Sequence, residues 1–175
     1  MMIDGTRAGE IGRPLLEAVA AQALVLLNGA SVAAGAAAPA SPSGWRPLWT
    51  PQDYASLVWA LSSCGHSCRA VLDAVAERVR AQIAPPLSAS REAGHEPTMA
   101  ELPYNGQDVA QLAWGFAAGG VHDPRLMRLM ARVAGCRLSS LKPHDCAELA
   151  WALAVSGVGA PVLFEQMAQI VEGRA

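Results

Sequence analysis

The sequence has few aromatic side chains, no strand-like alternation of apolar and polar residues, and no excess of positive charge. Its 175 residues include two Phe and two Tyr. Runs of β-branched residues with a period of two are absent, so a β-sheet is not expected. Alanine is abundant instead. It is the best helix former, and its small side chain lets helices approach closely. The composition therefore predicts helices packed on helices.

The charge balance argues against one general mode of nucleic-acid binding. The formal net charge is −2 and the isoelectric point is about 6.1. A domain that binds nucleic acid through its overall field is usually clearly basic. Any contact with nucleic acid must therefore come from a local basic patch. The slightly acidic balance favours the alternative, a protein that binds only other proteins.

The chain also lacks a long, strongly apolar run. The most apolar stretch, Leu15 to Ala40, is interrupted by polar residues and glycines, and much of it is alanine. A membrane helix normally needs about 20 strongly apolar residues, so no membrane span is expected. The N-terminal segment MMIDGTRAGEIGRP has neither the apolar core of a signal peptide nor an Arg/Ser-rich presequence.

Cysteine usage points to neither disulfides nor metal. The spacing of the four cysteines matches neither paired zinc clips nor a secreted disulfide framework, and reduced thiols are expected; they are Cys64, Cys68, Cys136 and Cys146. With His66, the first two form a C-x-H-x-C string. A structural zinc needs four ligands, and no second cluster supplies them, so no metal site is expected.

Signals of catalysis are missing as well. The sequence contains no HExxH, GxSxG or Walker pattern, and its acidic residues are scattered. His95 and His122 lie in expected loops without a paired nucleophile. We therefore expect no enzyme activity, no cofactor and no small-molecule substrate.

One feature is strongly present, a sixteen-residue motif that occurs three times. The copies are TPQDYASLVWALSSCG (50–65), NGQDVAQLAWGFAAGG (105–120) and KPHDCAELAWALAVSG (142–157). Asp, Ala, Leu, Trp and Gly stand at identical offsets in all three. Trp114 and Trp151 are 37 residues apart, whereas Trp59 and Trp114 are 55 apart because of an 18-residue insertion. Internal repetition of this kind is the mark of a repeat architecture.

Each copy of the motif specifies one short helix with both ends marked. Thr50 and Asn105 are good N-caps, and Pro51 and Pro143 suit the first helical position. The shared Asp lies in the first turn, where it meets the positive end of the helix. The closing Gly suits a left-handed C-cap. A second helix follows each motif, at Cys68 to Arg80, Pro124 to Gly135 and Pro161 to Glu172, and Pro14 to Leu27 resembles the last of these.

These signals predict an all-α fold, an α-solenoid of helix-pair repeats with a period of about 37 residues. The expected units are a partial N-terminal repeat (1–28), an Ala/Gly/Pro linker (29–49), repeat 1 (50–83), a Pro-containing insertion (84–104), repeat 2 (105–141) and repeat 3 (142–175). Two adjacent apolar stripes on each first helix predict equivalent, largely buried core positions for Trp59, Trp114 and Trp151. Because the array opens on a half-unit and ends without a polar capping repeat, we expect both ends to pack on neighbouring subunits.

The motif resembles the octotricopeptide repeats of algal and plant organelles and the similar heptatricopeptide repeats of apicomplexan mitochondria. The copies that begin at Asp108 and Asp145 match best. The resemblance covers Thr50 to the C-terminus and, more weakly, Pro14 to Leu27. It implies an organellar RNA-associated protein that binds single-stranded or ribosomal RNA, in a mitochondrion or alternatively a chloroplast. Many relatives carry a C-terminal RAP domain, which nothing here matches.

Two sets of residues are candidates for contact with RNA. Polar residues four apart on each first helix are candidates to face bases, because equivalent positions of a solenoid line one surface; they are Gln52, Ser56, Gln107, Gln111, His144 and Glu148. A basic stretch without acids is the candidate for phosphate contact; it comprises Arg125, Arg128, Arg132, Arg137 and Lys142. Both sets also fit ordinary solvated helix faces.

The sequence thus predicts a non-catalytic, organellar RNA-associated helical repeat protein. The expected role is a structural or rRNA-stabilising subunit of a ribonucleoprotein such as a mitochondrial ribosome. The arginines Arg125, Arg128 and Arg132, spaced i, i+3, i+7, would clamp RNA phosphates. The alternative is a protein–protein scaffold without RNA contact.

Overall fold

The computed structural model describes residues 5–32, 49–65, 68–99 and 101–173, and within these ranges the protein is all-α, as predicted. The α-helices are α1 (Gly5–Val32), α2 (Pro51–Ser63), α3 (Arg69–Ala93), α4 (Gly106–Ala118), α5 (Pro124–Cys136), α6 (Pro143–Val155) and α7 (Pro161–Val171). A short 3-10 helix, η1 (Leu138–Ser140), connects α5 to α6. Most of the expected linker 29–49 and His66 of the C-x-H-x-C string lie outside the described residues.

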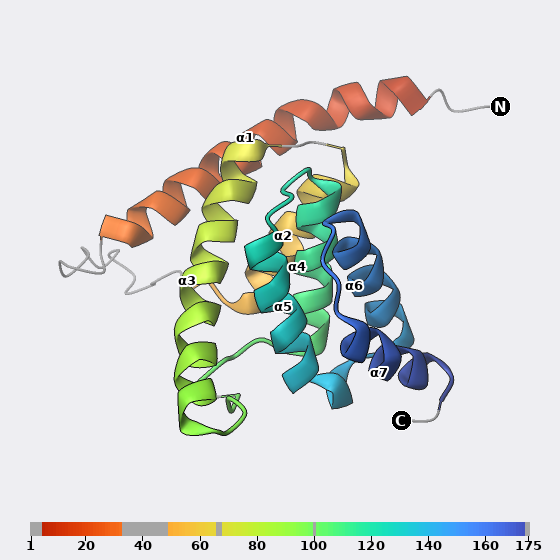
Figure 1. Cartoon of the computed structure of the whole chain (residues 1–175). Coiled ribbons are helices and arrows are strands. Elements are labelled where there is room, and N and C mark those ends of the chain that lie inside the picture. The colour runs from red at the N-terminus through yellow and green to blue at the C-terminus, as the bar shows by residue number, and fades with distance from the viewer. Residues whose placement is uncertain (1–4, 33–48, 66–67, 100, 174–175) are drawn as a thin grey trace.

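The helices form two layers. In the first layer α4 packs between α2 and α6. In the second layer α3 packs between α1 and α5, and α5 packs on α7. Figure 1 shows α5 and α7 in front of α4 and α6, with α1 crossing the upper end of α3. The helices that carry the repeated motif therefore lie side by side, although long stretches of chain separate them in the sequence.

The N-caps of α2 and α4 are those that the sequence predicts. The Thr50 backbone N donates to Asp53 Oδ2 at 2.8 Å, and the Asp53 backbone N donates to Thr50 Oγ1 at 3.2 Å. Asn105 and Asp108 repeat this reciprocal pair at 3.1 and 2.9 Å. Each pair satisfies two backbone N–H groups that the first turn of a helix leaves without a partner.

The N-cap of α6 has only one of these two hydrogen bonds. The Lys142 backbone N donates to Asp145 Oδ2 at 2.8 Å, but the lysine side chain has no acceptor to return a bond. The C-terminal ends again follow the prediction, since the closing glycine of each motif has a positive φ of 65°, 81° or 66°; these are Gly65, Gly120 and Gly157. Only glycine adopts such angles without steric cost.

Gly115 brings α2 and α4 into close contact. A Cβ atom at this position would lie 2.6 Å from Val58 Cγ1 and 3.2 Å from the Val58 carbonyl carbon. At the same crossing, Ser62 Oγ donates to the Gly115 carbonyl at 2.7 Å. The equivalent positions of the other two motifs are Ala60 and Ala152, so all three copies carry a small residue directly after the tryptophan. This close approach determines how far apart the outward-facing side chains of the two helices lie.

The main correction concerns the segment 84–104, which the sequence predicts to be a Pro-containing insertion separate from repeat 1. Helix α3 does not end at Arg80 but continues to Ala93, through Pro85 and Pro86. The cause is burial, because Val79, Ile83, Leu87 and Ser90 continue one buried stripe along the helix at spacings of four, four and three residues. Packing of this stripe outweighs the cost of two prolines, although each removes a helical hydrogen bond.

The N-terminal helix also differs from its predicted bounds. Pro14 was expected at its first position, but α1 begins at Gly5 and ends at Val32, so Pro14 lies inside it. Residues 29–32, assigned to the linker, are helical. Helix α1 packs on α3, and Arg78 of α3 donates a hydrogen bond to the Leu27 carbonyl. That α1 is the second helix of an earlier unit stays a prediction.

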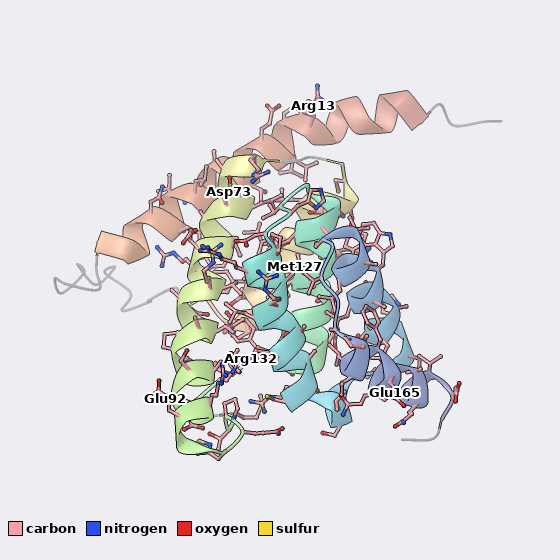
Figure 2. The ribbon with its side chains drawn as sticks, in the orientation of Figure 1. Arg13, Asp73, Glu92, Met127, Arg132 and Glu165 are labelled. Atoms are coloured by element: carbon pink, nitrogen blue, oxygen red, sulfur yellow. The ribbon has the colours of Figure 1, made fainter. Side chains whose placement is uncertain are left out.

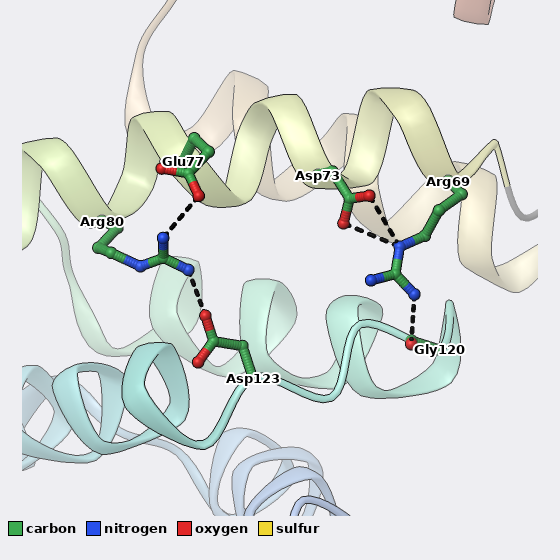
Figure 3. A network of polar contacts seen from close by, with 6 residues as sticks. All are labelled: Arg69, Asp73, Glu77, Arg80, Gly120 and Asp123. Atoms are coloured by element: carbon green, nitrogen blue, oxygen red, sulfur yellow. Dashed lines mark hydrogen bonds and ion pairs between the residues drawn. The ribbon is translucent and has the colours of Figure 1, made fainter.

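A network of charged residues joins α3 to the loop between α4 and α5 (Figure 3). Arg69 Nε donates to Asp73 at 2.8 Å, and its Nη1 donates to the Gly120 carbonyl at 3.0 Å. About three turns further along α3, Arg80 pairs with Asp123. Asp123 is also the N-cap of α5, since its Oδ1 accepts from the backbone N of Arg125 at 2.8 Å. One carboxylate therefore both caps a helix and connects the two helices.

We expect Asp123→Ala to lower the free energy of unfolding by about 1–2 kcal/mol, because it removes a cap and an ion pair. Partial burial acts to raise the pKa of Asp123, but the backbone N–H groups of Leu126 and Arg125, together with Arg80, lower it overall. A lowered pKa stabilises the fold at pH values above the ordinary carboxyl range, and this stability is lost as the pH falls through the folded-state pKa. Thermal melts from pH 7 to pH 3 would show this dependence. Asp123→Ala should reduce it, and an unchanged pH profile would contradict the assignment.

Candidate functional site

The three motif tryptophans form a row of rings on the surface. Trp59 and Trp114 have ring centroids 6.5 Å apart, and Trp114 and Trp151 have centroids 6.3 Å apart, with tilts of 38° and 39°. The three rings are therefore neighbours in one row, and their equivalence as repeat positions stays a prediction. The predicted burial is wrong, because Trp59 is 44% exposed and Trp151 is 45% exposed, and Trp114 is only partly buried.

The exposure follows from the position of each tryptophan on its helix. Two residues after each tryptophan comes a fully buried side chain; these are Leu61, Phe116 and Leu153. Two residues correspond to about 200° around an α-helix, so the tryptophan points nearly opposite to the core. Of the two apolar stripes on each first helix, one faces the second layer of helices. The stripe that contains the tryptophan lies on the side of the helix that faces away from the second layer.

Polar side chains flank each ring on the same helix face. The residues seven and three positions before each tryptophan are Gln52 and Ser56, Gln107 and Gln111, and His144 and Glu148. These spacings correspond to two turns and one turn, so each set of three shares a face. Gln52, Ser56, Gln107 and His144 are exposed, and Gln111 and Glu148 are half-buried. We call the three tryptophans and these six residues the tryptophan face.

Glu148 is the least ordinary residue of the tryptophan face. Its side chain is 11% exposed, and its Oε1 lies 3.2 Å from His144 Nε2. Its Oε2 is buried and has no hydrogen-bond partner among the described residues. Burial raises the pKa of Glu148, and the nearby His144 opposes this shift in part. The carboxyl group is thus desolvated and only half satisfied.

The basic stretch that the sequence singles out divides into different environments. Arg137 makes five hydrogen bonds of 3.0–3.3 Å to backbone carbonyls, and its acceptors are Pro97, Thr98, Leu102, Tyr104 and Cys136. A guanidinium has five N–H donors, so none remains for a phosphate. Arg137 thus connects residues 97–98 and 102–104 to the end of α5, and it is not a candidate for phosphate contact.

The other basic residues remain on the surface. Arg125, Arg128 and Arg132 are exposed on the outward side of α5, opposite its buried Leu126 and Met130. Arg132 lies between α3 and α5 (Figure 2), where it donates to the Leu87 carbonyl at 3.0 Å. The side chains of Arg125 and Arg128 make no hydrogen bond or ion pair to the described residues. Lys142 is exposed at the start of α6, away from this group.

The two predicted contact sets lie on opposite sides of the protein. The tryptophan face is on the outward side of the first layer, and the α5 arginines are on the outward side of the second. A single extended strand that stacks on the tryptophans would therefore not reach these arginines. The sequence indicated both sets, but their separation depends on how the two layers pack.

Other kinds of site find little support in the described part of the chain. No cluster of three or more His, Cys, Asp or Glu side chains is arranged to hold a metal ion there. None of the helices in the described ranges is long and apolar enough to cross a membrane. Comparison of the chain with known protein families, curated proteins and solved structures finds no match.

Proposed function

We propose that this chain is a short α-solenoid of helix-pair repeats, with a period of about 37 residues, that binds single-stranded segments of RNA. The observation that supports this most directly is the row of tryptophans. Partly exposed aromatic rings on a common face serve as stacking platforms for unpaired bases. Each stacked base contributes about 1–3 kcal/mol in proteins that bind single strands.

The rings are at present in contact with each other. Their centroid separations of 6.5 and 6.3 Å, with tilts of 38° and 39°, are those of directly packed aromatic side chains. Successive stacked bases are about 3.4 Å apart, so a base between two parallel rings needs the ring planes about 6.8 Å apart. Binding would therefore require each pair of indoles to turn parallel and move apart, which would admit one base into each of the two steps, Trp59–Trp114 and Trp114–Trp151.

The tryptophan face would contribute stacking and hydrogen bonds more than charge. Its polar residues are mainly amides and a hydroxyl, and its one carboxyl group, that of Glu148, lies 3.2 Å from the His144 ring nitrogen. Phosphate contact would instead come from Arg125 and Arg128 on the opposite side. Two separate RNA contacts on opposite faces suit a subunit embedded in a folded ribonucleoprotein. The proposed role is accordingly structural and non-catalytic.

The cellular setting is proposed from the resemblance to organellar repeat families alone. It is a mitochondrion, or alternatively a chloroplast, and the assembly is a ribonucleoprotein such as a mitochondrial ribosome. Neighbouring protein subunits would cover the ends of the array. At the α6–α7 end, an open hollow with a largely apolar lining includes Ala147, Ala150, Phe164, Met167 and Val171, and this observation favours the second candidate, a protein–protein scaffold.

Salt dependence of RNA binding tests the proposal. Log affinity for a single strand falls with log salt concentration at a slope of about −0.7 per contacted phosphate. If Arg125 and Arg128 contact phosphates, replacing both with Gln should make the slope shallower by about 1 to 1.5. The melting temperature should hardly change, since both side chains are exposed and Gln is a good helix former.

The same titrations distinguish the stacking contact from the phosphate contact, and they distinguish RNA binding from the scaffold alternative. The expectation is that tryptophan variants lower affinity at every salt concentration without changing the slope. Arg137→Gln serves as a structural control, and we expect it to lower the melting temperature because five backbone carbonyls lose their donor. If no RNA binds at low salt, the scaffold candidate stands in place of the RNA proposal.

A further inference from the structure

Of the two polar positions of the tryptophan face, the one that lies one turn before each tryptophan is different in all three repeats. One turn before each tryptophan stand Ser56, Gln111 and Glu148. Serine and glutamine both donate and accept hydrogen bonds, whereas an ionised carboxylate only accepts. Repeat 3 therefore carries an acceptor where the other two repeats carry side chains that can adapt to either kind of partner.

The environment of Glu148 leaves one acceptor atom without a donor. Oε1 is paired with His144 Nε2 at 3.2 Å, whereas Oε2 is buried and lacks a hydrogen bond to the described residues. Buried polar atoms in folded proteins are almost always hydrogen-bonded, so an unpaired one calls for an explanation. If the neighbouring side chains move to uncover this atom, a ligand with an N–H donor would supply the missing bond.

The aromatic step next to Glu148 defines what kind of ligand fits. Glu148 lies one turn before Trp151 on the same helix face, and the Trp151 ring is 6.3 Å from that of Trp114. A planar group admitted between these two rings would lie on the helix face that carries Glu148. The site therefore combines an aromatic platform with a single acceptor, which suits a planar aromatic ligand that carries an N–H donor.

We propose that the Trp114–Trp151 step selects a nucleobase that presents an amino group, such as cytosine, over uracil, with Glu148 as the accepting residue. This inference rests on the proposed RNA function. A carboxylate accepts from the N4 amino group of cytosine. Uracil has nearly the same shape, but a carbonyl oxygen replaces that amino group. Its lone pairs would face those of the carboxylate.

His144 acts as a positioning residue in this arrangement. It holds Oε1 and thereby fixes the orientation of the carboxyl group, which leaves Oε2 for the base. In repeat 2 the residues equivalent to His144 and Glu148 are Gln107 and Gln111, and an amide can donate or accept according to its orientation. The Trp59–Trp114 step should therefore show much less preference between the two pyrimidines.

The test compares the affinities of the full chain for short oligocytidylate and oligouridylate of equal length, at neutral pH and fixed salt. The wild-type chain should bind the cytosine strand about 10-fold more tightly, as expected for one base-edge contact. Glu148→Gln converts this position to its repeat 2 counterpart, and the preference should fall to about 1–2-fold. Gln111→Glu should increase the preference by introducing a second acceptor.

Controls separate this inference from general electrostatics. Glu165→Gln removes the same charge from α7, outside the tryptophan face, and should leave the preference unchanged (Figure 2). Circular dichroism melts would confirm that each variant is folded. His144→Gln should reduce the preference in part, because the carboxyl group loses the partner that orients it.

Three outcomes would overturn the inference, and they are distinguishable. If Glu148→Gln leaves the preference intact while Trp114→Ala abolishes binding, RNA stacking stands and the selectivity does not. If neither strand binds, both the selectivity and the proposed RNA-binding function are wrong. The third outcome is that tetramethylammonium chloride quenches tryptophan fluorescence more than sodium chloride at the same concentration, and that Glu148→Gln removes this difference. The site then belongs to an organic cation of a protein partner.

Discussion

Trp114→Ala is expected to weaken binding of single-stranded RNA by about 100-fold, whereas Trp59→Ala and Trp151→Ala are expected to weaken it by about 10-fold each. The difference follows from the arrangement of the rings, because Trp114 borders both steps and each outer ring borders only one. Loss of one stacked base costs about 1–3 kcal/mol, and about 1.4 kcal/mol corresponds to a factor of ten. Fluorescence anisotropy of an end-labelled oligonucleotide would measure the three affinities.

Stability measurements must accompany this experiment, since Trp114 is also the most covered of the three rings. Trp114→Ala should lower the melting temperature more than Trp151→Ala, whose ring is 45% exposed. Truncation of a fully buried tryptophan typically costs about 3–5 kcal/mol, and both variants should lose less than this. Trp114→Phe retains an aromatic platform and should recover most of the affinity. Equal binding by all three alanine variants would contradict a stacking role.

The helix boundaries were largely predictable because local signals define them. The caps at Thr50 and Asn105, and the closing glycines with positive φ, involve residues no more than a few positions apart in the sequence. The end of α3 was not predictable in the same way. Pro85 and Pro86 suggested a break, but the buried side chains of Ile83 and Leu87 continue the helix through it. The apolar spacing from Val79 to Leu87 is the sequence signal that indicates a continuous helix.

The candidate site was predictable in its members but not in its geometry. The equivalence of the tryptophans follows from identical offsets in the three motifs. Their exposure does not, because the sequence shows two adjacent apolar stripes and only packing determines which of them faces the second layer. The assignment of Arg137 failed for a related reason. Its acceptors include Pro97 and Tyr104, which lie 40 and 33 residues away in the sequence, so no local pattern could indicate them.

The site also depends on the close approach of α2 and α4 at Gly115, so Gly115→Val should be among the most destabilising single changes in this region. Its Cβ alone would lie 2.6 Å from Val58 Cγ1 and 3.2–3.3 Å from backbone atoms of Val58 and Trp59. Overpacking of this kind typically costs about 1–3 kcal/mol, and the branched side chain places Gly115→Val near the upper end. For a chain of this length, about 3 kcal/mol corresponds to a loss of roughly 6–12 °C in melting temperature.

Gly135 provides a matched control within the same protein. It lies in α5 with no atom within 4 Å of the position that a Cβ would occupy. Gly135→Ala should therefore stabilise the protein by about 0.4–1 kcal/mol, because alanine restricts the unfolded chain without a clash. Gly115→Ala should instead destabilise it, since its steric cost exceeds this gain. The changes in melting temperature of the two alanine variants must have opposite signs. If both variants are stabilised, α2 and α4 do not approach closely at Gly115.

The same substitution connects the core to the proposed RNA contact. Gly115 is adjacent to Trp114 in α4, and the backbone it meets in α2 is that of Val58 and Trp59. A side chain that separates the two helices must also increase the 6.5 Å between the Trp59 and Trp114 rings. The Trp114–Trp151 step, which lies across α4 from this crossing, should keep its spacing. We therefore expect Gly115→Ala to weaken binding of RNA at the first step while the cytosine preference assigned to Glu148 at the second step remains. Loss of that preference in folded Gly115→Ala protein would show that the two steps do not act as separate sites.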